Sequence, residues 1–423
     1  MIASSFVFSA HGLAMSPSRY IGFDLGTSGC RISVIEQSSD NNYQEVYTQA
    51  VPWGDPSQKG SSSTSSSYDD HEAWMDAVKT LLERTSEAVH LKTVKSICVS
   101  GTSASCLIVD VKANLVTRKA RMYNYDVKAS RKETDDPIHA FRAMELLDEF
   151  APPQHTARAP TGSLAKLLTW AMENKLSPSE VLCHQSDYVS MRLRSKNRAC
   201  GAGPENTWSV YSDWHNCLKL GYDVQKCEWP EWMVGCLRKA TGMDNPLCVL
   251  PNKVISPGES MGAISKDMAT KFGISEDCII VGGTTDSNAA FFAAAGTEPV
   301  AGTAVTSLGS TLAIKYLSET YVEDADRGVY SHRFPSVFPT SANWLAGGAS
   351  NVGCAILRQE EFSNDELVKL SESIDPNKDS ILQYYPLCKK GERFPISDSN
   401  KQPVLSPKPD NRQEYLHGIL QVS

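Results

Sequence analysis

The stretch Tyr20–Glu36 constrains the fold of this chain most strongly, because its residues predict two strands joined by a tight, glycine-rich turn. The first strand is apolar, with Ile21 and Phe23, and it ends on a single acid, Asp24. Residues 26–29 are glycines and hydroxyl residues, which allow a sharp turn. The amides and hydroxyls of such a turn can hold phosphate oxygens, and the carboxylate can hold Mg²⁺ directly or through water. The alternative is an ordinary hairpin turn with Asp24 at its edge.

A second candidate for chemistry lies where a short buried strand, Ile279–Val281, runs through the sequence GGTTDSN into a helix of small residues, Ala289–Ala295. Gly282 and Gly283 allow a substrate to approach the backbone, and the helix amides favour a bound anion. Asp286 can accept a proton from a hydroxyl group. The alternative interpretation is that Asp286 only caps the helix.

A motif similar to the first turn recurs in the second half of the chain. Ser307–Ile314 resembles Asp24–Arg31, since in both a Leu-Gly pair is followed by two hydroxyl residues and then by an apolar strand. Two such turns predict two related domains, each offering a phosphate loop to one cleft. The acid is present only in the first copy. A third glycine-rich stretch, Trp344–Asn351, predicts a turn that opens a helix over Val352–Arg358.

Two further segments predict a place for a small polar ligand. Ser100–Ser105 is a loop of small residues at the end of the predicted strand Val94–Val99, and ligands of α/β folds gather at the carboxyl ends of strands. Met122–Asp126 combines polar and aromatic residues, which suits the recognition of hydroxyl groups. A surface turn is the alternative for this second segment.

Composition narrows the class of protein. A chain of 423 residues, 41% hydrophobic and 21% charged, fits a soluble globular protein of two domains. The formal net charge of −8 argues against nucleic-acid binding, and no apolar run reaches membrane-spanning length. The 12 cysteines form no CxxC pair, so we expect reduced thiols in the core and neither a zinc site nor a redox pair.

The first residues of the chain, 1–19, have no acid and contain several serines. This composition fits a plastid or mitochondrial presequence, although the segment is short and carries one arginine. We therefore expect a chloroplast protein with a clipped transit peptide or a disordered start at residues 1–19, and a cytoplasmic location is the alternative.

In chain order, the motifs FDLGTSG, SGTSAS, MYNYD, GGTTDSN, SLGST, GGASN and GERFP resemble those of the FGGY carbohydrate kinases, the relatives of xylulokinase, ribulokinase and glycerol kinase. The resemblance runs from Tyr20 to the end of the chain and is closest to the plant and cyanobacterial xylulose-kinase-like group, for which D-ribulose is the expected substrate. It implies an α/β fold of two ribonuclease-H-like domains, as in the actin/hexokinase/sugar-kinase superfamily. The expected division is a sugar-binding domain over 20–295 and an incomplete nucleotide-binding domain over 296–423, with a cleft between them.

The resemblance also implies roles for residues of this chain. Asp286 matches the catalytic base, which also binds the sugar, and Asp24 matches the acid that helps to hold Mg²⁺. The positions that match the two ATP-phosphate loops and the nucleotide-side glycines are Gly26, Thr27, Ser28, Gly309, Ser310, Thr311, Gly347 and Gly348. The positions that fall on the sugar side are Ser103, Ala104, Asn124 and Asp126.

Two departures from the family pattern affect the expected function. The Gln-Met-His-Gly pattern of xylulokinase has become residues 102–105, Thr-Ser-Ala-Ser, which lacks the imidazole and argues against D-xylulose. The adenine loop of the family does not follow Leu416–Leu420, which predicts a truncated or alternatively spliced form. We expect a kinase that uses ATP and Mg²⁺ to phosphorylate D-ribulose, as a monomer or homodimer without nucleic-acid or membrane partners. The alternatives are a D-xylulose kinase and a sugar-binding form with little kinase activity.

Overall fold

The computed structural model describes residues 17–38, 40, 42–53, 68–129, 137–153, 155–194, 207–296, 298–309, 311–335 and 343–421. Most of the segment in which a presequence was predicted, residues 1–16, lies outside the described residues, as does Ser310 of the second turn. A search of the described helices for one that is long and apolar enough to cross a membrane finds none.

The part of the chain up to Thr285 contributes a six-stranded sheet in the order β10-β11-β4-β1-β2-β3. The first three strands form an antiparallel meander, whereas β4 and β11 run parallel to β1. Its strands are β1 (Ser18–Leu25), β2 (Gly29–Gln37), β3 (Tyr43–Pro52), β4 (Val94–Gly101), β10 (Ser260–Ala263) and β11 (Ile279–Thr285).

The alternation of buried and exposed residues explains strand β1, and a capped N-terminus helps to explain the helix that packs on it. In β1, Ile21, Phe23 and Leu25 alternate with more exposed residues and are buried, as a half-buried strand requires. They share a core with the buried face of α1 (His71–Ala88), whose first turn is capped by the side chain of Asp70. The strand–turn–strand prediction for the start of the chain is therefore confirmed.

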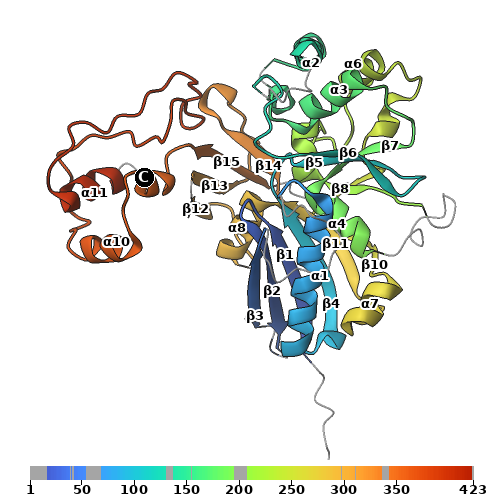
Figure 1. Ribbon diagram of the computed structural model, residues 1–423, viewed down its shortest axis with the longest axis horizontal. Helices are drawn as coiled ribbons and strands as arrows, with labels where there is room; N and C mark the ends of the chain where they lie inside the picture. The colour runs from blue at the N-terminus through green and yellow to red at the C-terminus, as the bar shows by residue number, and fades with distance from the viewer. Residues whose placement is uncertain are drawn as a thin grey trace, which may run out of the picture.

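A second group of elements stands above this sheet in Figure 1. A three-stranded sheet in the order β6-β5-β7 packs there with helices that share one apolar core. Its strands are β5 (Cys106–Asp110), β6 (Leu115–Arg121) and β7 (Glu180–His184), and its helices are α2 (Pro137–Phe150), α3 (Ser163–Glu173) and α6 (Glu231–Thr241). Elements between the two groups are α4 (Gln185–Leu193), α5 (Trp214–Cys217) and the pair β8 (Tyr211–Asp213) and β9 (Lys253–Ile255). Helix α7 (Lys266–Phe272) shares the core of the first sheet.

Helix α8 (Asp286–Ala295) leads from the first sheet to a second sheet, which has the order β12-β13-β15-β14 and antiparallel pairing throughout its described strands. These strands are β12 (Ala304–Leu308), β13 (Leu312–Ser318), β14 (Tyr330–Arg333) and β15 (Trp344–Ser350). On the far left of Figure 1, α10 (Asn364–Ser371) and α11 (Arg412–Leu420) pack with α9 (Ala355–Gln359) around a small separate core.

The prediction of a turn over Trp344–Asn351 is wrong, because this stretch is strand β15. Its two glycines serve close packing instead. A Cβ atom on Gly347 would lie 2.0 Å from the carbonyl oxygen of Ile314 on β13, and one on Gly348 would lie 2.3 Å from the ring of Phe394. Glycine inside a strand thus marks close approach of neighbouring groups here, rather than a change of chain direction.

Candidate active site

The two predicted acids, Asp24 and Asp286, come from the carboxyl ends of two parallel strands. Asp24 pairs with Ser100 of β4 on one side, and Thr284 of β11 pairs with the same Ser100 on the other. Asp286 follows two residues after Thr284, so the acids are about two strand spacings apart, on the order of 10 Å. They also interact electrostatically. This edge of the sheet is where α/β folds bind ligands.

Asp24 is held by its neighbours on the sheet. The hydroxyl of Ser100 donates to Asp24 Oδ1 over 3.2 Å and lies 3.2 Å from the carbonyl oxygen of Phe23. Burial raises the pKa of Asp24, while Ser100 and the charge of Arg31 act in the opposite direction. No group of three or more ligating His, Cys, Asp or Glu side chains occurs among the described residues. Mg²⁺ commonly takes one or two carboxylates with substrate phosphates and water, so Asp24 fits such an ion.

Asp286 is the first residue of α8, and the capping position belongs to Thr285. The interpretation of Asp286 as only a cap is therefore wrong. Its Oδ1 accepts a hydrogen bond of 2.7 Å from the backbone N–H of Ser287. Burial raises its pKa, the Ser287 N–H partly offsets this effect, and the charge of Asp24 raises the pKa further. A carboxylate with a raised pKa is suited to accept a proton near neutral pH.

The glycines before Asp286 have another role than the one predicted. A Cβ atom on Gly283 would lie 1.9 Å from the carbonyl oxygen of Val99, and one on Gly282 would lie 2.6 Å from that of Ser256. The packing of β11 against its neighbours therefore explains why glycine occupies these two positions, and the approach of a substrate is not needed to explain it.

Both predicted phosphate turns are present as hairpin turns. In the first, Gly26 N donates to the carbonyl oxygen of Gly29 over 3.0 Å, and the side chains of Thr27 and Ser28 are exposed. The indole N–H of Trp53 anchors the turn by donating to the Gly26 carbonyl. In the second turn, Gly309 N donates to the carbonyl oxygen of Thr311 over 3.0 Å, and the side chain of Thr311 is exposed.

The predicted sugar-side segments lie next to each other. Buried Lys166 joins them, since its Nζ donates to the carbonyl oxygens of Ala104 and Met122 over 2.8 and 2.7 Å. Ala104 is buried with a φ of 64°, and neighbouring Ser103 is partly exposed. Tyr123, in the second segment, interacts electrostatically with Asp286. The two segments therefore border the candidate active site.

Asn124 and Asp126 are less clearly part of the site. Asn124 is exposed, and Asp126 Oδ1 accepts from the backbone N–H groups of Lys128 and Ala129. The latter contacts are those of a turn-capping aspartate, as the alternative interpretation predicted.

Five residues near Asp286 were not among the predicted site residues. Four of them interact electrostatically with Asp286, and they are Tyr123, Lys219, Lys315 of β13 and Tyr330 of β14. The fifth, Arg393, acts on Tyr123, Lys219 and Tyr330 rather than on Asp286 itself. Lys315 alone carries a sequence signal, because it is a single charge within the otherwise apolar run LAIKYL directly after the second turn.

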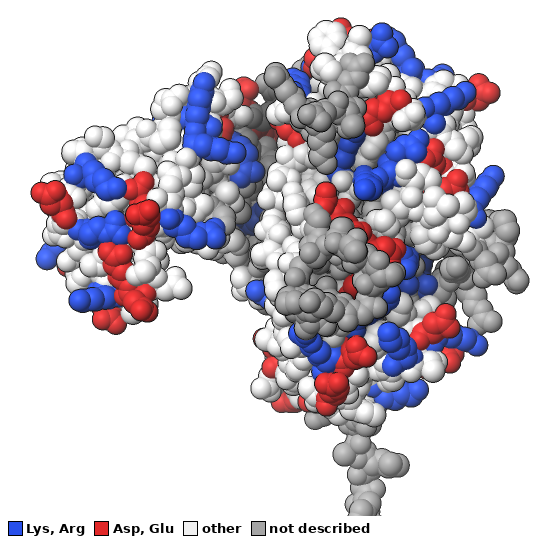
Figure 2. Space-filling view, viewed as in Figure 1, with Lys and Arg blue, Asp and Glu red and all other residues white. Residues whose placement is uncertain are grey.

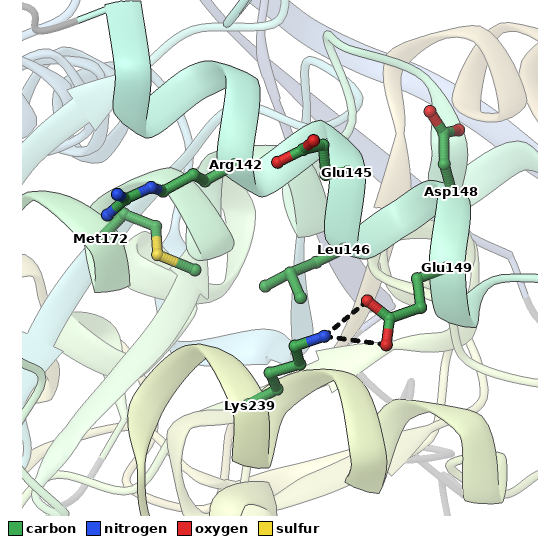
Figure 3. A pocket seen from close by; sticks show the side chains of 7 residues that line it. All are labelled: Arg142, Glu145, Leu146, Asp148, Glu149, Met172 and Lys239. Carbon is green, nitrogen blue, oxygen red and sulfur yellow. Dashed lines mark hydrogen bonds and ion pairs between the residues drawn. The ribbon is translucent and has the colours of Figure 1, made fainter.

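A separate pocket of about 550 Å³ opens between α2, α3 and α6 (Figure 3). Charged side chains line most of it, and Lys239 Nζ donates to both carboxylate oxygens of Glu149 over 2.8 and 2.6 Å. Neither Asp24 nor Asp286 contributes to this pocket. On the face shown in Figure 2, a groove separates the part with α10 and α11 from the first sheet, and charges of both signs are interspersed.

A search of protein-family models finds no match to this chain. Solved structures do match. A gluconate kinase from Lactobacillus acidophilus has a TM-score of 0.67 at 15% identity, with 96% of this chain and 75% of that one covered. A xylulose kinase from Bifidobacterium adolescentis gives 0.65 at 18%, covering 96% and 79%. A Plasmodium falciparum glycerol kinase with ADP gives 0.67 at 15%, covering 96% and 76%. The chain therefore shares the α/β fold of these solved structures.

Proposed function

We propose that this protein is an ATP-dependent carbohydrate kinase that phosphorylates the terminal hydroxyl of a ketopentose. D-Ribulose, giving D-ribulose 5-phosphate, is the first candidate, and D-xylulose is the alternative. The observation that carries the proposal is the meeting of Asp24 and Asp286 at one sheet edge, in a fold that also presents two hydroxyl-bearing hairpin turns. Similar folds named as xylulose, gluconate and glycerol kinases support the class of reaction.

In the proposed reaction, Asp286 takes the proton as the O–H bond of the sugar hydroxyl breaks. A bond forms between that oxygen and the γ-phosphorus of ATP. The bond from the γ-phosphorus to the bridging oxygen breaks, and its electron pair leaves with ADP. The turns at residues 26–28 and 309–311 hold phosphate oxygens through amides and hydroxyls. Asp24 is placed to hold Mg²⁺, which when bound neutralises part of the phosphate charge.

A coupled assay of ADP release against a panel of ketoses, polyols and aldonates tests the proposal. We expect turnover of a ketopentose, and we expect Asp286→Asn to lower kcat by at least about 10²-fold, since the general base is lost. Asp277→Asn is a matched control, because Asp277 is exposed at the opposite end of the same strand. Residual activity of Asp286→Asn within about tenfold of the parent would contradict the assignment of the base.

One observation favours a second candidate, a sugar-binding form with little kinase activity. In the first sheet, β1 pairs with β2 on one side and with β4 on the other, and β4 pairs in turn with β11. In the second sheet, the corresponding strand β12 pairs with β13 alone among the described strands. Calorimetric titration with ATP and with D-ribulose separates the candidates. Binding of D-ribulose without binding of ATP would favour the second one.

A further inference from the structure

Lys315 is a buried lysine with no hydrogen-bond partner for its Nζ atom among the described residues. It lies on β13, is 4% exposed, and pairs with Gly347 of β15, which in turn pairs with Tyr330 of β14. Residues in one such row share a face of the sheet. Lys315 Nζ accordingly lies 5.2 Å from the centroid of the Tyr330 ring. Leu317, two residues on, packs against Phe291 of α8, so this face points at the helix that begins with Asp286.

A second buried lysine, Lys166, has the hydrogen bonds expected of a structural residue. Lys166 is also fully buried, but its Nζ donates to two backbone carbonyl oxygens at 2.7 and 2.8 Å. Burying an amine without such acceptors destabilises a fold. Within the described part of the chain, Lys315 has no such acceptors, and its contact with the face of the Tyr330 ring leaves the hydrogen-bonding capacity of its buried amine unused.

Other unpaired polar atoms lie at the same junction. Nine buried side-chain nitrogen or oxygen atoms of the described residues have no hydrogen-bond partner, and five of them belong to the first turn of α8 or to the facing sheet. These five are Thr285 Oγ1, both amide atoms of Asn288, Lys315 Nζ and His332 Nδ1. Such a concentration of unpaired polar atoms is typical of a site that binds a polar group.

The charges around Lys315 favour an anion. Burial and, to a smaller extent, the charge of Lys219 lower the pKa of Lys315 to about 7, although the charge of Asp286 acts in the opposite direction. Among the described residues no carboxylate oxygen lies within 4.0 Å of Lys315 Nζ, so no ion pair neutralises it. An anionic ligand would restore the charge of this ammonium group and accept its hydrogen bonds.

We propose that Lys315 is a catalytic residue that binds the non-bridging oxygens of the phosphoryl group during its transfer to the hydroxyl facing Asp286. This inference rests on the proposed kinase function. Lys315 forms and breaks no covalent bond. It donates hydrogen bonds to the transferred group, which is anionic in ATP, in the transition state and in the sugar phosphate.

The phosphoryl group fits this position better than the sugar does. Lys315 comes from the second sheet, four residues after Thr311 of the second phosphate turn, whereas the predicted sugar-side segments belong to the first half of the chain. A ketose offers only neutral hydroxyl and carbonyl groups, whereas phosphate is an anion that a lysine binds as a point charge. An aldonate carboxylate is the competing ligand, and it becomes an outcome of the test.

The test is Lys315→Met in the full-length chain, measured with the same coupled assay. We expect kcat to fall by about 10²-fold with every accepted sugar, with a small change in the KM for the sugar. In calorimetric titrations, the variant should bind inorganic phosphate at least tenfold more weakly than the parent and D-ribulose equally well. A loss confined to aldonate substrates, or unchanged kcat and phosphate binding, would overturn the assignment.

Two further variants separate this role from a structural one. Lys315→Met should unfold at the same temperature as the parent or higher, since it removes an unpaired buried amine, whereas Lys166→Met should unfold at a lower temperature. Lys369→Met, at an exposed position on α10, is the surface control and should change nothing. If the parent chain phosphorylates no sugar, the kinase proposal fails, while the phosphate titration still decides whether Lys315 binds an anion. A lowered unfolding temperature with unchanged phosphate binding would make Lys315 structural.

Discussion

The ionisation of Asp286 should make catalysis and the stability of the fold depend on pH in opposite directions. Burial and the nearby Asp24 raise its pKa above that of an unfolded chain. The folded state therefore binds the proton more tightly, so the stabilising contribution is present at low pH and is lost as pH rises through the folded pKa. As a base, however, Asp286 must be ionised. Activity should fall as pH drops through the same pKa, and the ionised carboxylate should destabilise the fold at neutral pH.

Asp286→Asn tests this stability effect independently of any substrate. We expect its unfolding temperature to exceed that of the parent at pH 7.5, and the difference should shrink as the pH falls towards 5. Differential scanning calorimetry at several pH values measures it. Asp277→Asn, the exposed control, should follow the parent at each pH. An Asp286→Asn variant that is less stable than the parent at pH 7.5 would contradict the raised pKa.

At the scale of single residues, the sequence indicated the two acids but not the basic groups around them. Asp24 and Asp286 each end an apolar strand, and this pattern is local and visible. Lys219 reaches Asp286 from 67 positions away and Lys315 from 29, and no local pattern encodes such a contact. Only the packing of β13 against α8 brings Lys315 to the site.

At the scale of elements, the close packing of strands at their glycines can be tested by substitution. Gly347→Ala should destabilise the protein by about 1–3 kcal/mol or more, because its Cβ would lie 2.0 Å from a backbone oxygen that cannot move aside cheaply. Gly22→Ala is the matched control in strand β1, since nothing lies within 4 Å of its Cβ, and we expect a change within about 0.5 kcal/mol. Urea unfolding measures both, and equal midpoints for the two variants would contradict the close packing of β15.

The same glycines explain which elements could be predicted. Helix α1 has both of its signals within its own sequence, namely apolar residues at helical spacing and the capping residue Asp70. Strand β15 was mistaken for a turn because glycine favours turns and close strand contacts alike, and the sequence does not distinguish the two. The repeated motif predicted the positions of both hairpin turns, but the turns differ in length. Four residues separate the paired Leu25 and Cys30, and three separate the paired Leu308 and Leu312. Backbone pairing, rather than residue type, sets that difference.

At the scale of the whole molecule, the α/β fold that the family resemblance implied is confirmed. The antiparallel pairing throughout the described part of the second sheet was not predicted, because strand order depends on contacts between distant segments. The contacts that join the two sheets were also invisible in the sequence. They centre on Arg333, whose carbonyl oxygen lies 2.7 Å from His215 Nε2 and accepts from Trp214 Nε1 over 3.0 Å.

The Arg333 side chain strengthens this junction, and its removal should make the two sheets unfold less cooperatively. Its Nη1 donates from β14 to the carbonyl oxygens of Val224 and Gln225, both over 3.1 Å, and these two residues precede β11 of the first sheet in the chain. Arg333→Ala should therefore lose about 2 kcal/mol, from charge-assisted hydrogen bonds alone. Urea unfolding followed by tryptophan fluorescence and far-ultraviolet circular dichroism should then give separated transitions.

Arg327→Ala is the matched control for the junction, because Arg327 is exposed and its guanidinium group contacts the local Asp324, at 3.0 Å. An exposed pair of this kind contributes little, so we expect a change within about 0.5 kcal/mol and coincident transitions. If Arg333→Ala unfolds with the same midpoint and the same single transition as Arg327→Ala, the sheets are joined by the apolar contacts of α8 rather than by Arg333. Because the proposed site takes Asp286 from one side of this junction and Lys315 from the other, a separated transition should be accompanied by a loss of phosphate binding.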